Sequence, residues 1–125
     1  MGLYVLLVDD EPDSLHLLQT VLEYAGALVT RLTSAPDAVR TLERLAPDVM
    51  VADIAMPGRD GYWLIREVRA REAAHGRRLP VIALTAHGET HGPPRTLAAG
   101  FDMHLHKPVD PWNLCRAIAS LARRP

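Results

Sequence analysis

Hydrophobic residues follow two alternating patterns along the chain. Short apolar and β-branched runs, each bounded by acidic residues, Gly or Pro, predict five β-strands. These runs are Leu3–Val8, Leu28–Leu32, Val49–Ala52, Pro80–Leu84 and Met103–His106. The first run shows no polar alternation, as expected of a strand covered by helices on both faces. The second is more mixed, which predicts a place nearer the edge of a sheet.

The segments between these runs have the apolar spacing of helices. A first helix carries the stripe Leu15, Leu18, Val21 and Leu22. Gly26 follows this stripe where a left-handed C-terminal cap is expected. Ser34 and Asp37 resemble a capping box, which predicts the start of a second helix. Its stripe continues to Pro47 through Val39, Leu42, Leu45 and Ala46.

Three more helices are predicted in the second half of the chain. Asp60 is placed to cap a helix that runs to about Ala74 and carries Leu64, Ile65 and Val68. Gly92, Pro93 and Pro94 oppose helix formation before Pro94, which leaves a short fourth helix ending at Gly100. Asp110 and Pro111 make an N-cap and a first turn for the last helix, with Leu114, Ile118 and Leu121.

Strand and helix thus alternate five times, which predicts an α/β fold with a mainly parallel sheet between two layers of helices. The length of 125 residues fits one domain, and we expect it to span residues 1–122. Residues 123–125 are expected to be a C-terminal tail or the start of a linker. Ligands of open α/β sheets bind at the carboxyl ends of the strands.

Composition narrows the classes of function. The formal net charge of −1 argues against direct binding of nucleic acid, which requires a basic face. Cys115 is the single cysteine, so an internal disulfide and a thiolate zinc site are excluded, and a reducing cytoplasm is the default location. No apolar run reaches the roughly 18 residues of a membrane helix, so no membrane anchor is expected.

Polar residues gather where the predicted strands end. Asp9, Asp10 and Glu11 follow the first strand, Asp53 the third, Thr85 the fourth, and Lys107, the only lysine, the fifth. Two like charges about 4 Å apart repel by about 4 kcal/mol at a surface-like dielectric. Such a cluster needs a cation or raised pKa values, and Mg²⁺ with oxygen ligands is the natural cation.

Four strings carry a resemblance to a known family. They are VDDE at 8–11, DIAMPGRDG at 53–61, ALTAHG at 83–88 and HKP at 106–108. In order and spacing they resemble the receiver domain of two-component response regulators, over essentially the whole chain. The resemblance implies the flavodoxin-like doubly wound fold, with five parallel strands in the order 2-1-3-4-5 and five helices.

The resemblance also implies a chemistry. Asp53 is expected to accept a phosphoryl group from a phosphohistidine on a sensor histidine kinase or a histidine phosphotransfer protein. Mg²⁺ is expected on Asp10, Asp53 and the backbone carbonyl of Ala55, with Asp9 acting through water. The chain is then not an enzyme in the ordinary sense, because phosphotransfer and slow autodephosphorylation are its only reactions.

Three residues complete the implied mechanism. Lys107 and the Thr85 hydroxyl are expected to bind the remaining phosphoryl oxygens. A shift of Thr85 toward the phosphoryl group frees space for His104, where the family commonly has Tyr or Phe. That movement is expected to switch the face formed by the fourth helix, fifth strand and fifth helix.

Other interpretations of the same residues stay open. The chain could be a binding module of this fold that signals without phosphate, or a phosphatase with an aspartyl nucleophile, although Ala55 stands where such enzymes carry a general acid. A kinase or output domain fused outside this chain is also open, since LPVIALTAHG is similar to receivers of hybrid sensor histidine kinases.

Histidine, tryptophan and glycine residues have simpler interpretations. His104 and His106 share a strand face, and with His87 and His91 they suggest a transition-metal site, although packed or exposed histidines are commoner. Trp63 and Trp112 are expected to pack in the core or at an interface, Cys115 is expected in the core, and Gly61 is expected to meet a backbone requirement.

Overall fold

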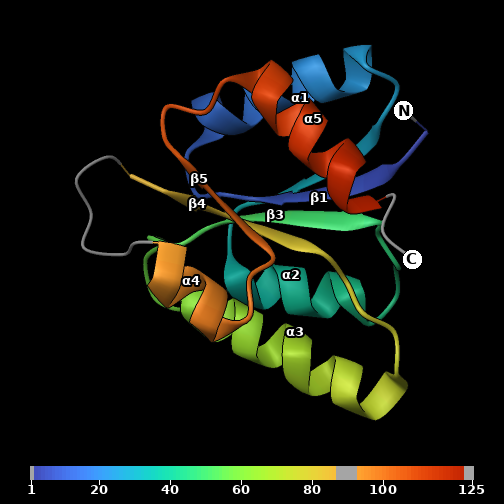
Figure 1. Ribbon diagram of the computed structural model, residues 1–125, viewed down its shortest axis with the longest axis vertical. Coiled ribbons are helices and arrows are strands. Elements are labelled where there is room, and N and C mark those ends of the chain that lie inside the picture. Colours follow the sequence, from blue (N-terminus) through green and yellow to red (C-terminus); the bar gives the residue numbers. More distant parts are fainter. Residues whose placement is uncertain (1, 87–92, 123–125) are drawn as a thin grey trace.

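The computed structural model describes residues 2–86 and 93–122, in which helices lie on both faces of a central sheet (Figure 1). Strands and helices alternate from β1 to α5. The strands are β1 (Tyr4–Val8), β2 (Leu28–Leu32), β3 (Val49–Asp53), β4 (Val81–Thr85) and β5 (Met103–His106). The helices are α1 (Pro12–Tyr24), α2 (Ala35–Leu42), α3 (Gly61–His75), α4 (Pro93–Ala99) and α5 (Pro111–Ala122). The five predicted strands are confirmed to within one residue at each end.

The sheet has the order β2-β1-β3-β4-β5, and each pairing is parallel. Val5 in β1 pairs with Val29 in β2 on one side and with Val49 in β3 on the other. The strand order reverses direction at β1, between β2 and β3, so β1 and β3 flank the topological switch point of the fold. The predicted strand order is confirmed, and β2 lies at an edge, as its mixed sequence indicated.

Two hydrophobic clusters lie on opposite faces of the sheet. Val5 and Leu7 of β1 belong to the cluster that α1 and α5 complete. Leu6 and Val8, which point to the other face, belong to the cluster of α2 and α3. Figure 1 shows α1 and α5 on one side and α2, α3 and α4 on the other. Burial on both faces explains why the first apolar run has no polar alternation.

The predicted end of α1 is confirmed. Gly26 has a φ of 97°, which is costly for residues with a Cβ atom. Its N–H donates to the Glu23 carbonyl at 2.9 Å, and the N–H of Ala27 donates to the Leu22 carbonyl at 3.0 Å. These two bonds form a Schellman motif, which satisfies carbonyls that the end of the helix leaves unpaired.

Aspartate caps begin two other helices as predicted. The Asp60 carboxylate accepts a hydrogen bond from the N–H of Trp63 at 2.9 Å. The Asp110 carboxylate accepts one from the N–H of Trp112, also at 2.9 Å. Each cap satisfies a backbone donor that has no partner within its own helix.

The predicted extent of α2 was wrong at its C-terminal end. Ser34 does cap the helix, accepting from the N–H of Asp37 at 3.3 Å, but α2 ends at Leu42 rather than at Pro47. Leu45 is 45% exposed, so the apolar stripe leaves the helix before it reaches Pro47. Pro47 disfavours helix at the residue before it, and the chain must turn here to enter β3.

Helix α4 is short, as the prolines predicted. It spans seven residues from Pro93, one residue earlier than expected, and Gly100 follows it with a φ of 119°. Thr96 on this helix is fully buried. None of the helices in the described part of the chain has the length and apolar character that a membrane crossing requires.

The aromatic and thiol side chains have structural surroundings. Trp63 packs against the core cluster of α2 and α3, whereas Trp112 is 49% exposed and meets Tyr24 edge to face at 6.1 Å between ring centroids. Cys115 is buried in the cluster under α5, as predicted, and burial raises the pKa of its thiol.

Candidate functional site

Three aspartates meet at the carboxyl end of the sheet. Asp9 follows β1 directly, Asp10 comes next, and Asp53 ends β3. Parallel pairing of Val8 with Ala52 brings these strand ends side by side. One carboxylate oxygen of each aspartate lies within 4.8 Å of the others. This group, the acidic cluster, is the gathering that the sequence predicted.

Burial makes the acidic cluster electrostatically demanding. Asp9 and Asp53 are 1% and 3% exposed, whereas Asp10 is half-buried. Oδ1 of Asp9 accepts a hydrogen bond from the N–H of Glu11 at 2.9 Å. Its other oxygen, Oδ2, is buried and makes no hydrogen bond of acceptable geometry among the described residues. An ionised oxygen held this way needs a cation nearby.

Lys107 supplies part of that charge. Its Nζ atom lies 3.0 Å from Oδ2 of Asp9, as an ion pair without hydrogen-bond alignment, and 3.1 Å from Oδ2 of Asp53. Glu11 Oε1 is 3.6 Å away. One ammonium therefore faces four carboxylates, counting Asp10, and the site keeps a net negative charge.

The pKa values reflect this balance. Burial raises the pKa of Asp53 to about 6; the Lys107 ammonium opposes the shift and Asp9 adds to it. Burial lowers the pKa of Lys107, but its contacts with Asp9 and Asp53 outweigh burial and raise it overall. Lys107 thus stays an ammonium at neutral pH, and Asp53 is a carboxylate whose ionisation the site only partly compensates.

The loop after β3 is shaped around Asp53. Oδ1 of Asp53 accepts a hydrogen bond from the N–H of Ala55 at 3.2 Å. Gly61 begins α3 so close to this loop that an added Cβ atom would lie 2.7 Å from the Asp53 carbonyl and 2.8 Å from Cα of Ile54. The predicted backbone requirement at Gly61 is confirmed, and it is steric.

Thr85 completes the rim at the end of β4. Its side chain is fully buried, and its carbonyl accepts from the N–H of Lys107 at 2.6 Å. Its hydroxyl Oγ1 lies 2.9 Å from Nε2 of His104 and 3.2 Å from Nδ1 of His106. The two histidines therefore share a face of β5, as predicted, and both contact Thr85.

The described residues do not form the transition-metal site that the histidines suggested. His87 and His91 lie outside the described residues. Within residues 2–86 and 93–122, the acidic cluster is the only group of three His, Cys, Asp or Glu side chains that could hold a metal ion.

Sequence reasoning missed Thr96. Its hydroxyl lies 2.9 Å from Nδ1 of His104, the ring nitrogen that faces away from Thr85. The signal that could have found it is a single hydroxyl at a buried position of a short apolar helix. The contact itself depends on how α4 docks on β5, which the local sequence does not encode.

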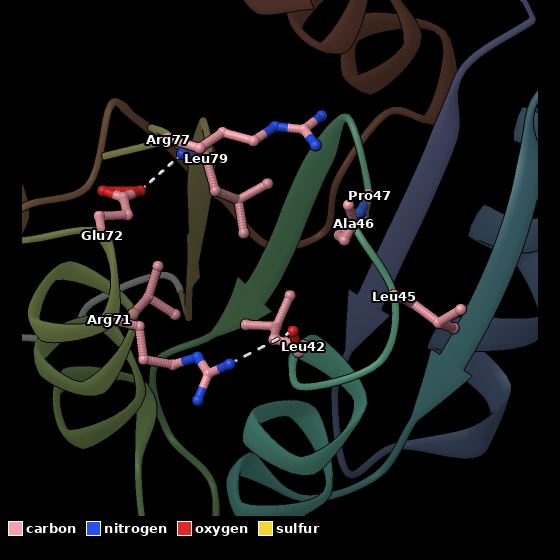
Figure 2. Close-up of a pocket in the computed structure, with 9 residues that line it drawn as sticks. Leu42, Leu45, Ala46, Pro47, Arg71, Glu72, Arg77 and Leu79 are labelled. Carbon is pink, nitrogen blue, oxygen red and sulfur yellow. Dashed lines mark hydrogen bonds between the residues drawn. The ribbon is translucent and has the colours of Figure 1, made fainter. Parts of the chain in front are cut away.

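An apolar pocket of about 190 Å³ lies elsewhere, between the end of α2, helix α3 and the start of β4 (Figure 2). Glu72 at its wall accepts from the N–H of Leu79 at 2.5 Å, and Arg71 donates to the Leu42 carbonyl at 3.4 Å. No residue of the acidic cluster lines this pocket, so it is not part of the polar site. The remaining lining residues are Leu45, Ala46, Pro47, Val68 and Arg77.

Comparison with known proteins agrees with the fold. A sequence model of the response regulator receiver domain matches residues 5–119. An uncharacterized 14.6 kDa protein of Leptolyngbya boryana is 45% identical over 114 residues, which cover 91% of this chain and 86% of that protein. Sensor protein GacS of Pseudomonas syringae pv. syringae is 37% identical over 91% of this chain, but the match spans 13% of GacS.

Solved structures give the same result. The receiver domain of a Francisella response regulator has a TM-score of 0.88 at 28% identity, over 98% of both chains. The receiver domain of sensor histidine kinase PA1611 from Pseudomonas aeruginosa has a TM-score of 0.87 at 35% identity, over 99% of this chain and 100% of that one. The latter holds a magnesium ion in its active-site cleft. The chain described here therefore belongs to the response regulator receiver domain family of two-component signalling systems.

Proposed function

We propose that this receiver domain accepts a phosphoryl group on Asp53 from a phosphohistidine of a sensor histidine kinase or a histidine phosphotransfer protein. One observation carries the proposal: a buried carboxylate at the end of β3 lies 3.1 Å from the only lysine of the chain and within 4.8 Å of two further aspartates. Signalling relatives such as GacS support a kinase as the class of partner.

The reaction is a transfer of one phosphoryl group between two side chains. An oxygen of the ionised Asp53 carboxylate forms a bond to phosphorus while the bond from phosphorus to the donor imidazole nitrogen breaks. The electron pair of that bond stays with the imidazole, which takes up a proton. The product is an aspartyl phosphate, and its hydrolysis by water returns the site to its first state.

Positioned donors stabilise the charge of this transfer. The Lys107 ammonium already touches Asp53, so it is placed to bind one phosphoryl oxygen. The Thr85 hydroxyl at the end of β4 is assigned to a second oxygen. These are positions where a preorganised donor stabilises charge without reorganising during the reaction.

The residues of the acidic cluster fit Mg²⁺. Four carboxylates against one ammonium leave negative charge uncompensated, and the buried Oδ2 of Asp9 makes no hydrogen bond in the described structure. Oxygen ligands suit a hard divalent ion. Asp10, Asp53 and the carbonyl of Ala55 are assigned to hold it, with Asp9 acting through water. When bound, Mg²⁺ supplies positive charge to the phosphoryl oxygens and offsets the repulsion between the aspartates.

Output is assigned to the face formed by α4, β5 and α5. Thr85 ends β4 at the same edge of the sheet as Asp53 and also contacts His104, so a hydroxyl drawn toward a phosphoryl group changes what His104 contacts. His104 is the proposed switch residue.

Labelling with acetyl phosphate and Mg²⁺ tests the phosphoacceptor function. We expect intact-mass analysis to show one added phosphoryl group in the wild-type domain and none in Asp53→Asn. Absence of the adduct, under conditions that label another receiver domain, contradicts the proposal. An adduct that persists in Asp53→Asn moves the acceptor to another residue.

A binding module that signals without phosphate is the second candidate. It is favoured by one departure, a histidine at position 104 in place of the aromatic residue common in the family. Its distinguishing result is an Asp53→Asn variant with unchanged output. The phosphatase alternative predicts sustained turnover of a small phosphoester by the isolated domain.

The whole protein's activity is a separate proposal. The chain spans 13% of GacS and 51% of response regulator SaeR from Staphylococcus aureus. A fused kinase or output domain and a cytoplasmic location are therefore proposals. The domain limits of 1–122, with 123–125 as a tail or the start of a linker, stay a prediction, because the last three residues lie outside the described ones.

A further inference from the structure

His104 connects Thr85, at the end of β4, to α4 through both of its ring nitrogens. Its Nε2 lies 2.9 Å from Oγ1 of Thr85, and its Nδ1 lies 2.9 Å from Oγ1 of Thr96. Both threonine side chains are fully buried, so neither hydroxyl exchanges these bonds freely for water. The three side chains, which we call the imidazole relay, run from the end of β4 through β5 into α4.

Because a neutral His104 ring carries a single N–H, the direction of its hydrogen bond with Thr85 fixes the direction of its hydrogen bond with Thr96. A neutral imidazole carries one N–H, so one ring nitrogen donates and the other accepts. If the Thr85 hydroxyl donates to Nε2, the proton of the ring sits on Nδ1 and is donated to Thr96. If Nε2 carries the proton, Nδ1 is an acceptor, and the Thr96 hydroxyl must turn its own proton toward the ring.

The Thr85 hydroxyl has only one proton to donate. His104 Nε2 and His106 Nδ1 both face this hydroxyl, and the shorter contact, 2.9 Å against 3.2 Å, is to His104. In the tautomer that carries the ring proton on Nδ1, Thr85 donates to Nε2 of His104. A phosphoryl group on Asp53 offers oxygens that only accept, and it draws the Thr85 proton away from His104.

We infer that phosphorylation of Asp53 switches His104 from its Nδ1–H to its Nε2–H tautomer and thereby reverses the hydrogen bond between His104 and Thr96 in α4. The inference rests on the proposed phosphoacceptor function and makes His104 a positioning residue. The switch balances without a net change in charge, because Nδ1 releases a proton to solvent and Nε2 takes one up. Buried Thr96 then changes from acceptor to donor, which alters how α4 is held against β5.

Nitrogen NMR tests the tautomer directly. In the Mg²⁺-loaded domain with ¹⁵N-labelled histidine, long-range ¹H–¹⁵N spectra should show His104 as Nδ1–H, with the assignment confirmed by loss of its signals in His104→Phe. Addition of beryllofluoride, a stable phosphoryl mimic, should convert it to Nε2–H. Fluorine NMR of the same sample reports whether the mimic is bound at Asp53.

The outcomes separate the two proposals. Absence of bound beryllofluoride, together with absence of an acetyl phosphate adduct, overturns the phosphoacceptor function and the relay with it. Bound mimic with an unchanged His104 tautomer overturns the relay and leaves the phosphoacceptor function standing. An imidazolium in both states also overturns the relay, since both nitrogens then donate throughout.

Substitution of Thr96 tests transmission to α4. Thr96→Val removes the hydroxyl at nearly constant shape and does not touch the acidic cluster, so labelling of Asp53 should persist. The label-dependent shifts of the α4 amide signals at Leu97 and Ala98 should be lost, and Thr96→Ser should restore them. Thr20→Val, which removes a hydroxyl that donates to the His16 carbonyl within α1, should leave those shifts unchanged. Transmission that survives Thr96→Val refutes the relay.

Discussion

Two groups of charged side chains lie at opposite ends of the sheet, and their charges balance differently. At the amino ends of β4 and β5, an amino-end cluster joins two cations to two anions: Arg69, Arg78, Glu72 and Asp102. At the carboxyl ends, the acidic cluster and Glu11 share a single cation, Lys107. Both groups contain buried or half-buried carboxylates beside a half-buried cation, so burial alone does not distinguish them.

The amino-end cluster is saturated with hydrogen bonds. The Arg69 guanidinium donates to the carbonyls of Gly100 and Leu79 as well as to Glu72 and Asp102, at 2.5 to 3.0 Å. The carboxylate of Asp102 also accepts from the N–H of Val81 at 2.8 Å. A balanced and saturated cluster holds α3 against the starts of β4 and β5.

The acidic cluster has the opposite character. Its charge is unbalanced, one buried oxygen of Asp9 has no hydrogen bond from the residues that the structure describes, and burial raises the pKa of Asp53 to about 6. A fold keeps such a group at a cost in stability, which indicates a use beyond folding. Charge balance, rather than the mere presence of buried charge, therefore distinguishes the structural cluster from the candidate site.

Breaking the balanced cluster should have the largest effect on stability. Arg69 is 18% exposed, and Arg69→Met leaves Glu72 and Asp102 without their main partner. We expect the free energy of unfolding to fall by about 3–5 kcal/mol, as for other buried pairs that lose one member. Urea unfolding followed by circular dichroism measures it.

Arg66 on the same helix provides the control for this result. Its side chain is exposed, so Arg66→Met should change stability by no more than about 0.5 kcal/mol. Equal losses in the two variants mean that the amino-end cluster does not stabilise the fold.

Neutralising Asp53 should raise the free energy of unfolding, whereas the substitution at Arg69 should lower it. The pKa of about 6 in the folded state lies above the ordinary value of 3.8, so the folded state binds more protons and loses stability as pH rises between these values. In Mg²⁺-free buffer, Asp53→Asn should stabilise the domain by up to about 3 kcal/mol above pH 7, since one pKa unit corresponds to about 1.4 kcal/mol. The gain should vanish as the pH falls below about 4.

Thermal unfolding of both proteins across that pH range measures the difference. Asp13→Asn removes an equal but exposed charge from the first turn of α1 and serves as the control. A constant effect of Asp53→Asn over the same range is incompatible with a raised pKa at this residue.

Bound Mg²⁺ should reduce the difference in charge balance between the two clusters and stabilise the domain. At about ten times its dissociation constant, bound Mg²⁺ stabilises the native state by about 1.4 kcal/mol. We expect this gain in wild type, with a much smaller gain in Asp10→Asn or Asp53→Asn at the same concentration. Titration with Mg²⁺ in calcium-free buffer, with the melting temperature as the readout, measures this gain. A gain that is equal in all three proteins places the ion elsewhere.

Much of this architecture could be predicted from local sequence. Strands covered on both faces have continuous apolar runs, and Asp60, Asp110 and Gly26 mark helix ends by local hydrogen bonding or by φ. The gathering of Asp9, Asp53 and Lys107 followed from parallel strands ending at one edge. These features depend on residues close in sequence, or on a rule that holds for all parallel sheets.

The remaining features depend on docking between distant segments. Leu45 continues a helical stripe locally, yet the chain leaves α2 before it. Arg69 resembles any exposed helix arginine, because its partner Asp102 is 33 residues away. The contact of Thr96 with His104 likewise forms only once α4 packs on β5. Periodicity cannot report such contacts, since each residue alone fits an ordinary surface or core position.

Exchanging lysine for arginine, or the reverse, at the two ends of the sheet should have the smallest effects. Lys107→Arg keeps the charge, but a planar guanidinium is a poorer match than a compact ammonium to one oxygen of a crowded anionic site. We expect acetyl phosphate labelling of Asp53 to slow by about fivefold, equivalent to roughly 1 kcal/mol. The reverse exchange at the other end, Arg78→Lys, alters an exposed ion pair and should change stability by less than about 0.5 kcal/mol without affecting labelling. Time courses of intact mass compare the two variants directly. Because thirteen of the fourteen basic residues are arginine, a labelling rate unchanged in Lys107→Arg means that the single lysine owes nothing to phosphoryl chemistry.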